Sequence, residues 1–426
     1  MTAILRTYWQ AYRRFNRDVR LALSSHALVS FAMVGIMGVL FNLYLLRLGF
    51  DAVYIGLVAG ISSMARAVAC LLAGSVGARW GARRPMMAGI IVSIIFMALL
   101  LANEWLPAGA RGAWILIAYV LAAAGQSTHM VFCTPFLSAS TDATTRTHVF
   151  SVLAAISPLA SFAGSLIGGL LPGALAGALG ASLSDVAPYR YALLLAPLLL
   201  LPTLPILRAV RDMDRGMGQG ARQAAERGSA APYGIMAMLV VVMLFRWAGR
   251  APTSTFFNVY LDDQLGASTA LIGALAAAGS LLNVPGALFM PAIVARWGAY
   301  HTLIWCTVAM GFCLLPLALV PHWLAAGLSY VLTLGLYGIT SPAITVYSQE
   351  MVSAEWRPAM SGIMNMSVGL GSGLMAFGGG YAIAALGYRP LFLISAICMA
   401  IGAVVFWAYF RTPRGEMRRE GRGTLT

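Results

Sequence analysis

Lysine is missing from this chain of 426 residues, and all 28 of its basic residues are arginines. Without lysine the chain cannot form the phosphate-binding loop of nucleotide-driven proteins, which excludes a conventional nucleotide-driven pump within this chain. Catalytic motifs such as a nucleophile elbow are also missing, so we expect no enzymatic activity. Cysteine is sparse, and the five residues show no metal-ligand spacing, so we expect no metal, no other cofactor and no disulfide framework.

Charge is scarce as well. Charged residues make up 10% of the chain and hydrophobic residues 60%, whereas a soluble domain carries about 25% charged residues. We therefore predict an all-α membrane protein with twelve transmembrane helices surrounded by membrane lipids. The predicted spans are residues 24–48, 53–77, 85–103, 113–139, 147–174, 190–208, 234–261, 268–294, 300–320, 323–349, 358–385 and 389–410.

The arginines are unevenly distributed between the connections. Of the 28, 21 fall in the termini and loops on one side of the predicted spans and four on the other. Positive residues gather on the cytoplasmic side of membrane proteins, so both termini are expected in the cytoplasm. This placement explains the net charge of +14 without a nucleic-acid partner. We expect a monomeric, multi-pass protein of the bacterial inner (plasma) membrane.

The two halves of the chain repeat each other. The repeated strings are FNLYLLRLG (41–49) and FNVYLDDQLG (257–266), ARWGA (78–82 and 295–299), and YVL (119–121 and 330–332). Such repeats predict two pseudo-symmetric six-helix bundles made by duplication. The predicted parts are a basic amphipathic segment (1–22), an N-terminal bundle (23–210), a cytoplasmic linker (211–232), a C-terminal bundle (233–410) and a basic cytoplasmic tail (411–426).

Twelve spans, the six-plus-six repeat and a basic loop between spans two and three together resemble the major facilitator superfamily, over essentially the whole chain. That family carries the loop motif Gly-x-x-x-Asp-Arg-x-Gly-Arg-Arg. Here the loop reads GSVGARWGARR, in which Ala78 takes the acidic position. The matching residues are Gly74, Arg79, Gly81 and Arg83, with Arg84 just past the motif, and Arg296 and Gly298 in the second copy.

The resemblance implies that these loops form a cytoplasmic gate held by charge pairs. Because the motif aspartate is missing from both copies, Asp142, Glu350 and Glu355 are the candidate partners for the loop arginines. The glycines permit the tight turns of these loops.

A second family motif, associated with antiporters, resembles ASFAGSLIGG at 160–169 in span five, where Gly164, Gly168 and Gly169 match. Small residues at this spacing also allow close helix packing without any role in antiport. The segment therefore leaves packing and antiport open as alternatives.

Three arginines are predicted within spans: Arg66, Arg246 and Arg250. A charge near the bilayer centre costs about 2.5–3.5 kcal/mol on insertion scales. No aspartate or glutamate lies deep in any predicted span, so an anionic substrate is a candidate partner for these arginines. The alternative is that they bind backbone carbonyls, polar side chains or water.

Four uncharged polar residues complete the candidate substrate site. Asn42 and Asn258 occupy equivalent positions in spans one and seven, and Gln126 and His129 share a face of span four. His129 could couple transport to protons. The alternative for all four is packing and hydrogen bonding between helices.

These features predict a secondary transporter that moves a small organic solute, anionic or neutral, by alternating access. By analogy with the family, H⁺ is the expected coupling ion. The alternative is a drug or metabolite efflux antiporter of broad specificity. A lipid flippase or a transporter-like sensor is a more distant alternative.

Overall fold

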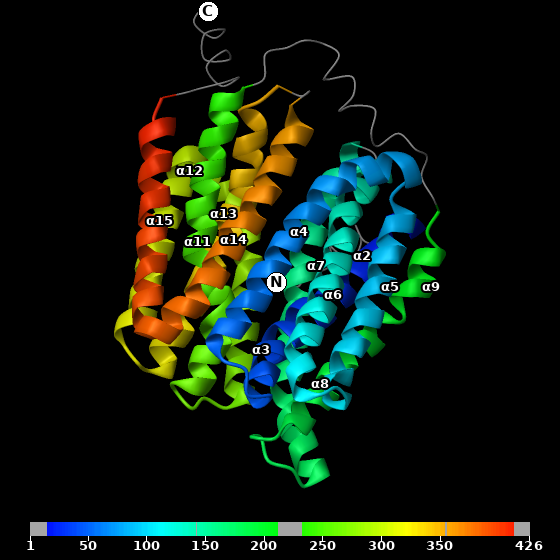
Figure 1. Cartoon of the computed structure of the whole chain (residues 1–426). Coiled ribbons are helices and arrows are strands. Elements are labelled where there is room, and N and C mark those ends of the chain that lie inside the picture. Colours follow the sequence, from blue (N-terminus) through cyan, green and yellow to red (C-terminus); the bar gives the residue numbers. More distant parts are fainter. Residues whose placement is uncertain (1–14, 142, 212–231, 354–355, 413–426) are drawn as a thin grey trace, which may run out of the picture. The chain divides into compact units, whose positions relative to one another are not determined.

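The computed structural model of the chain describes residues 15–141, 143–211, 232–353 and 356–412. Those residues form helices, with no strand among them (Figure 1). Nearly all of the predicted linker and tail, residues 1–14, Asp142 and Glu355 lie outside the described residues. The helices are α2 (Arg17–Val29), η1 (Ser30–Ile36), α3 (Met37–Arg47), α4 (Ala52–Trp80), α5 (Arg83–Leu100), η2 (Leu101–Trp105), α6 (Ala108–Ala139), α7 (Ala143–Leu179), α8 (Val186–Leu200), α9 (Thr203–Arg208), α11 (Tyr233–Asp263), α12 (Thr269–Leu319), α13 (Trp323–Glu350), α14 (Arg357–Leu386) and α15 (Tyr388–Phe410).

Within the described part of the chain, eleven helical stretches are long and apolar enough to cross a membrane. One of them, α12, runs for 51 residues, but Gly298 interrupts it with φ 76° and ψ 154°. A helix of that length would span about 76 Å at 1.5 Å per residue, far more than a bilayer. The predicted spans 268–294 and 300–320 correspond to the two parts of α12 on either side of Gly298, and the all-helical membrane fold is confirmed.

The first span begins earlier than predicted. Its helix α2 starts at Arg17, although the sequence prediction placed the start at residue 24 and assigned residues 1–22 to a separate amphipathic segment. Val19, Ala22 and Leu23 are buried at helical spacing, so the apolar face of the helix extends toward the N-terminus beyond the continuous hydrophobic run. Arginines beside these residues lower the average hydropathy of the segment, so a criterion based on that average does not detect the apolar face.

The middle of the first span is the π-helix η1, which joins α2 to α3. π-helical turns inside α-helices are rare and widen the helix locally. Ser30, its first residue, lies 2.9 Å from Ser157 of α7, measured between the two hydroxyl oxygens. Gly35 of η1 packs directly on Gly164 of α7, where an added methyl carbon would lie 2.6 Å from the Gly164 Cα atom.

The sequence repeat appears in the structure as a repeated aromatic contact. Phe41 of α3 stacks on Tyr119 of α6, with ring centroids 3.9 Å apart and planes inclined by 2°. Phe257 of α11 stacks on Tyr330 of α13, with centroids 4.0 Å apart and planes inclined by 11°. The phenylalanines belong to the repeated FN strings and the tyrosines to the repeated YVL strings, so both copies make the same contact.

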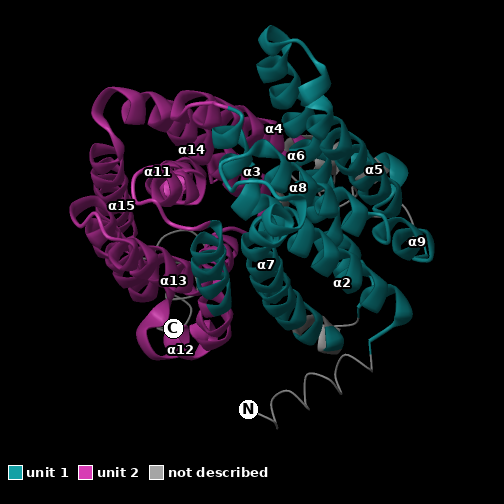
Figure 2. Cartoon of the chain, turned by 90° about the horizontal axis from the view of Figure 1, so that it is seen from below, with its two compact units in different colours: residues 1–48, 72–217, 269–281 teal, residues 49–71, 218–268, 282–426 magenta. Residues whose placement is uncertain are grey.

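Contacts divide the chain into two compact units (Figure 2). Unit 1 comprises residues 1–48, 72–217 and 269–281, and unit 2 comprises residues 49–71, 218–268 and 282–426. These units differ from the predicted bundles because residues 52–71 of α4, most of that helix, belong to unit 2, and residues 269–281 of α12 belong to unit 1. In unit 1 an added methyl carbon on Gly169 of α7 would lie 2.7 Å from the Gly273 Cα atom of α12. The predicted bundle boundaries near residues 210 and 233 stay predictions.

Candidate functional site

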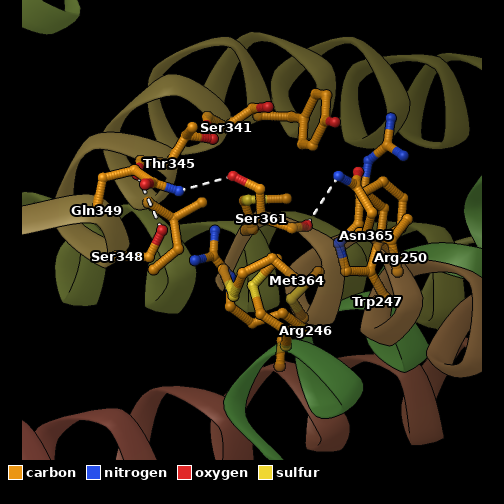
Figure 3. Close-up of a pocket in the computed structure, with 16 residues that line it drawn as sticks. Arg246, Trp247, Arg250, Ser341, Thr345, Ser348, Gln349, Ser361, Met364 and Asn365 are labelled. Carbon is orange, nitrogen blue, oxygen red and sulfur yellow. Dashed lines mark hydrogen bonds between the residues drawn. The ribbon is translucent and has the colours of Figure 1, made fainter. Parts of the chain in front are cut away.

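Unit 2 contains a cavity of about 290 Å³, roughly ten times the share of liquid volume that one water molecule takes. Its walls come from α11, α13 and α14, with one residue each from α12 and α15 (Figure 3). The lining residues are Met243, Arg246, Trp247, Arg250, Met310, Tyr337, Ser341, Ile344, Thr345, Ser348, Gln349, Ser361, Met364, Asn365, Val368 and Met399. None of them is acidic.

Helical spacing brings these side chains onto one wall per helix. On α11 the lining residues Met243, Arg246, Trp247 and Arg250 follow the spacing i, i+3, i+4, i+7. Residues at this spacing share one helix face. The same spacing places the hydroxyl residues of α13 and the polar and methionine residues of α14 on the faces that line the cavity.

Two glycines hold α11 close to α15 behind the cavity. A methyl carbon added to Gly249 would lie 2.7 Å from the backbone oxygen of Ser395, too close for any side chain. At Gly402 of α15 an added methyl carbon would contact the Arg246 Cγ atom at 3.4 Å. The aliphatic part of Arg246 is therefore packed against α15, and its guanidinium group extends into the cavity (Figure 3).

The other arginine of this wall, Arg250, is held by aromatic rings. Its guanidinium carbon lies 3.9 Å from the centroid of the Tyr337 ring and 5.1 Å from that of Trp247. The two rings meet edge to face, with centroids 5.8 Å apart. Cation–π contacts of this kind contribute roughly 0.5–2 kcal/mol each, the larger values applying to desolvated groups. Its Nε atom is buried and makes no hydrogen bond in the described structure.

Arg246 has no such support. Within the parts of the chain that the structure describes, its guanidinium group makes no hydrogen bond, no ion pair and no aromatic contact. Arg246 is half-buried, and a partly desolvated charge without an acidic partner is costly in a low-dielectric setting. Both guanidinium groups of the cavity therefore keep N–H donors without a partner in the described structure, and Arg246 in addition has no ring over its face.

The polar side chains of α13 and α14 are mostly bonded to the protein itself. Gln349 donates from Nε2 to the Ser361 hydroxyl over 2.8 Å, and Asn365 donates from Nδ2 to the Ser361 backbone oxygen over 2.9 Å (Figure 3). Ser348 and Thr345 donate to backbone oxygens one turn earlier in α13, over 2.9 and 3.0 Å. These bonds fix the positions of the polar groups around the cavity.

The remaining candidates of unit 2 lie apart from the cavity lining. Arg66 of α4 donates to the Ser63 hydroxyl over 2.6 Å, which matches the alternative that it binds a polar side chain. Asn258 is buried near the far end of α11. Of the predicted substrate residues, only Arg246 and Arg250 line the cavity.

Three candidates belong to unit 1. His129 is fully buried in α6, with its Nε2 atom 3.4 Å from the Ser25 hydroxyl and its ring centroid 6.5 Å from that of His26. Gln126 lies one turn earlier on α6 and is half-buried, as is Asn42 on α3. Their contribution to substrate or proton binding stays a prediction.

The two loop motifs form the expected turns. Gly81 and Gly298 adopt φ values of 71° and 76°, a region that side chains disfavour. Arg83 donates to the Val210 backbone oxygen over 3.1 Å. Gly74 lies within α4, Arg79, Arg84 and Arg296 are exposed, and Glu350 is exposed at the end of α13. The gate role of these residues stays a prediction.

The glycines of span five make close contacts with neighbouring helices. Gly164 of α7 contacts the backbone of η1, and a methyl carbon added to Gly168 would lie 3.2 Å from the Ile36 Cα atom. Gly169 packs on α12 as described above. Close packing accounts for all three glycines, and the antiport alternative is untested.

Arg246 and Arg250 were identified in the sequence because they are charged residues within apolar spans. This criterion does not identify the uncharged residues around them. The cavity also uses hydroxyl and amide groups at i, i+4 spacing, such as Ser341 with Thr345 and Ser361 with Asn365. Polar residues at that spacing in an otherwise apolar helix form a pattern from which the cavity lining is predictable. Trp247 and Tyr337 show no comparable pattern, because aromatic residues are common in membrane spans.

The fold resembles solved structures of membrane transporters. The inward-open xylose transporter XylE from E. coli has a TM-score of 0.75 at 13% identity, covering 95% of this chain and 98% of that chain. The nucleoside transporter NupG has a TM-score of 0.72 at 16% identity, covering 92% and 100%. A D-xylose-proton symporter has a TM-score of 0.71 at 15% identity, covering 92% and 97%. At these identities the likeness concerns the fold alone.

A sequence comparison with curated proteins found no match. A sequence profile of the Major Facilitator Superfamily, in contrast, matches residues 23–366 and 236–425, which together extend over nearly the whole chain. With its helical fold and apolar helices, the chain is a multi-pass membrane protein that belongs to the Major Facilitator Superfamily of transporters.

Proposed function

We propose that the chain is a secondary transporter of small organic anions, which bind in the cavity of unit 2 and cross the membrane by alternating access. The observation that carries this proposal is Arg246, a cationic group in a cavity without acidic residues and without a partner in the described structure. Arginine pairs with a carboxylate or a phosphate through two parallel hydrogen bonds, which would compensate the partly desolvated charge.

H⁺ is the proposed coupling ion. One structure of similar fold is that of a D-xylose-proton symporter, which supports this choice at the level of the fold only. Buried His129, beside His26, is the proposed titrating group. We also place the protein in the bacterial inner membrane, with both termini in the cytoplasm.

Flux in proteoliposomes tests the proposal. Purified protein is reconstituted, and uptake of labelled anions that stay ionised, such as benzenesulfonate, is compared with that of labelled organic cations under an imposed pH gradient. We expect anion flux that responds to the gradient. Arg246→Gln should reduce it by roughly 10- to 100-fold, because a hydrogen bond to a charged group contributes about 1.5–3 kcal/mol.

Arg208→Gln is the matched control, since Arg208 is exposed at the end of α9. It should leave the flux unchanged. Cation flux that Arg246→Gln does not affect would overturn the proposal.

Broad-specificity efflux is a second candidate, favoured by a different observation. Four methionines line the cavity: Met243, Met310, Met364 and Met399. Methionine is flexible and polarizable, and it is frequent at surfaces that bind many partners. Under this alternative, structurally unrelated cationic and neutral dyes would be exported, and Arg246→Gln would change the export of each by a similar factor.

A further inference from the structure

We infer that the preferred ligand of the cavity in unit 2 is an amphipathic monoanion: one carboxylate or sulfonate on an apolar, chiefly aromatic or alkyl, body. The inference rests on the proposed function and narrows its substrate class. Three features of the cavity carry it: the different surroundings of its two arginines, its methionine wall and the internal bonding of its polar groups.

The first feature indicates a single anionic group. Arg250 already faces the rings of Tyr337 and Trp247 at 3.9 and 5.1 Å, so its charge is stabilised within the protein. Arg246 has no equivalent contact among the described residues. A ligand with one negative charge pairs with Arg246, whose face no ring of the described residues covers. A second carboxylate would have to reach the N–H edge of Arg250, where the Nε atom is buried, and would lose its hydration on the way.

The second feature indicates an apolar body. Four methionines line the cavity together with Arg246: Met243, Met310, Met364 and Met399. Met399 is held in this wall by Gly249 of α11, where an added methyl carbon would lie 2.6 Å from its Cγ atom. A ligand whose anionic group reaches Arg246 must place the rest of its surface against these thioethers, which offer dispersion contacts and only weak hydrogen bonding.

The third feature limits the number of polar groups in the ligand. The side-chain donors of Gln349, Asn365 and Ser348 are directed to other protein atoms, over distances of 2.8 to 2.9 Å. A ligand can use these three donors only by breaking their bonds, which leaves one N–H and the carbonyl oxygen of each amide for polar groups of a ligand. An apolar body leaves the existing bonds intact.

Binding to the purified full-length protein tests the inference, measured by calorimetry and by quenching of tryptophan fluorescence. Binding is measured in place of flux because protonated aromatic acids cross bilayers unaided. The probes are benzoate, its neutral isostere benzamide and its dianionic analogue phthalate. Benzoate should bind at least tenfold more tightly than either of the others.

A second series varies the apolar body at constant charge, from butyrate to hexanoate and octanoate. Each added methylene should tighten binding by roughly threefold to fourfold until the cavity is full, since burial of a CH₂ group contributes about 0.8 kcal/mol. Met364→Ser should flatten this dependence on chain length. Phthalate binding as tightly as benzoate, or affinity independent of chain length, would overturn the inference.

Arg246→Gln separates a binding role from a structural one. It should abolish the preference for benzoate over benzamide while benzamide still binds, which shows that the cavity remains folded. A preference retained in Arg246→Gln would count against the inference. If the protein binds no anion at all and takes cations or neutral solutes, the proposed function fails. If it binds dicarboxylates or sugar phosphates best, the proposed function stands and this inference alone fails.

Discussion

Arg246 and Arg250 stand one helical turn apart on α11, and their neighbours give them different properties. The guanidinium group of Arg250 lies over the rings of Tyr337 and Trp247, whereas the stem of Arg246 packs against Gly402 and its charged group extends into the cavity. The residue type alone does not distinguish the two arginines. The contact with the Tyr337 ring does, because Arg250 makes it and Arg246, the proposed ligand-binding residue, does not.

The Tyr337 ring should therefore stabilise the fold of unit 2. We predict that Tyr337→Leu lowers the free energy of unfolding by about 1–2 kcal/mol, because it removes a cation–π contact and an edge-to-face aromatic pair. Thermal unfolding in detergent measures the change. Tyr337→Phe keeps the ring and should unfold close to the wild-type temperature. An equal loss in both variants would mean that the hydroxyl group, not the ring, is the stabilising part.

At the scale of elements, glycines decide how closely the helices approach. Gly164 and Gly173 both lie in α7, but Gly164 is tightly packed against another helix and Gly173 has free space around its Cα atom. A methyl carbon on Gly164 would overlap the Phe31 backbone oxygen of η1, and one on Gly173 would meet nothing within 4 Å. The pair is a controlled comparison within one helix.

We predict that Gly164→Ala destabilises the protein by about 1–3 kcal/mol, the usual effect of overpacking. Gly173→Ala should be neutral or stabilising by up to about 1 kcal/mol, because alanine is the better helix former. The midpoints of thermal unfolding compare the two. A Gly164→Ala variant as stable as Gly173→Ala would refute the close contact between α7 and η1.

The existence of the helices is predictable from the sequence, but their exact limits and the π-helix η1 are not. Long apolar runs predict that a span exists, because hydrophobic length is a property of the local sequence. They do not predict that α2 begins at Arg17, since only burial of Val19 and Leu23 reveals the continued face. The π-helix η1 was equally hidden, because its close fit to α7 depends on tertiary contacts.

At the scale of the whole molecule, the sequence repeat predicts packing contacts that the two copies share, but it does not predict where the cavity lies. Phe41 with Tyr119 and Phe257 with Tyr330 make the same stack in the two copies. The positions equivalent to Arg246 and Arg250 are Ser30 and Val34, which lie in η1. Asn42 and Asn258 were proposed because they repeat, yet the cavity is lined where the copies differ.

The orientation of the whole chain in the membrane follows from its arginines and can be tested directly. The insertion machinery retains positive loops on the cytoplasmic side, so the side that carries 21 of the 28 arginines should face the cytoplasm. Ser184, exposed between α7 and α8, then faces outward, and Arg208, exposed at the end of α9, faces inward. In a variant without the five native cysteines, a membrane-impermeant maleimide should label Ser184→Cys in intact cells. Arg208→Cys should react only after the cells are opened. The reverse pattern would place both termini outside, and it would also move the proposed gate loops at Gly81 and Gly298 to the outer face.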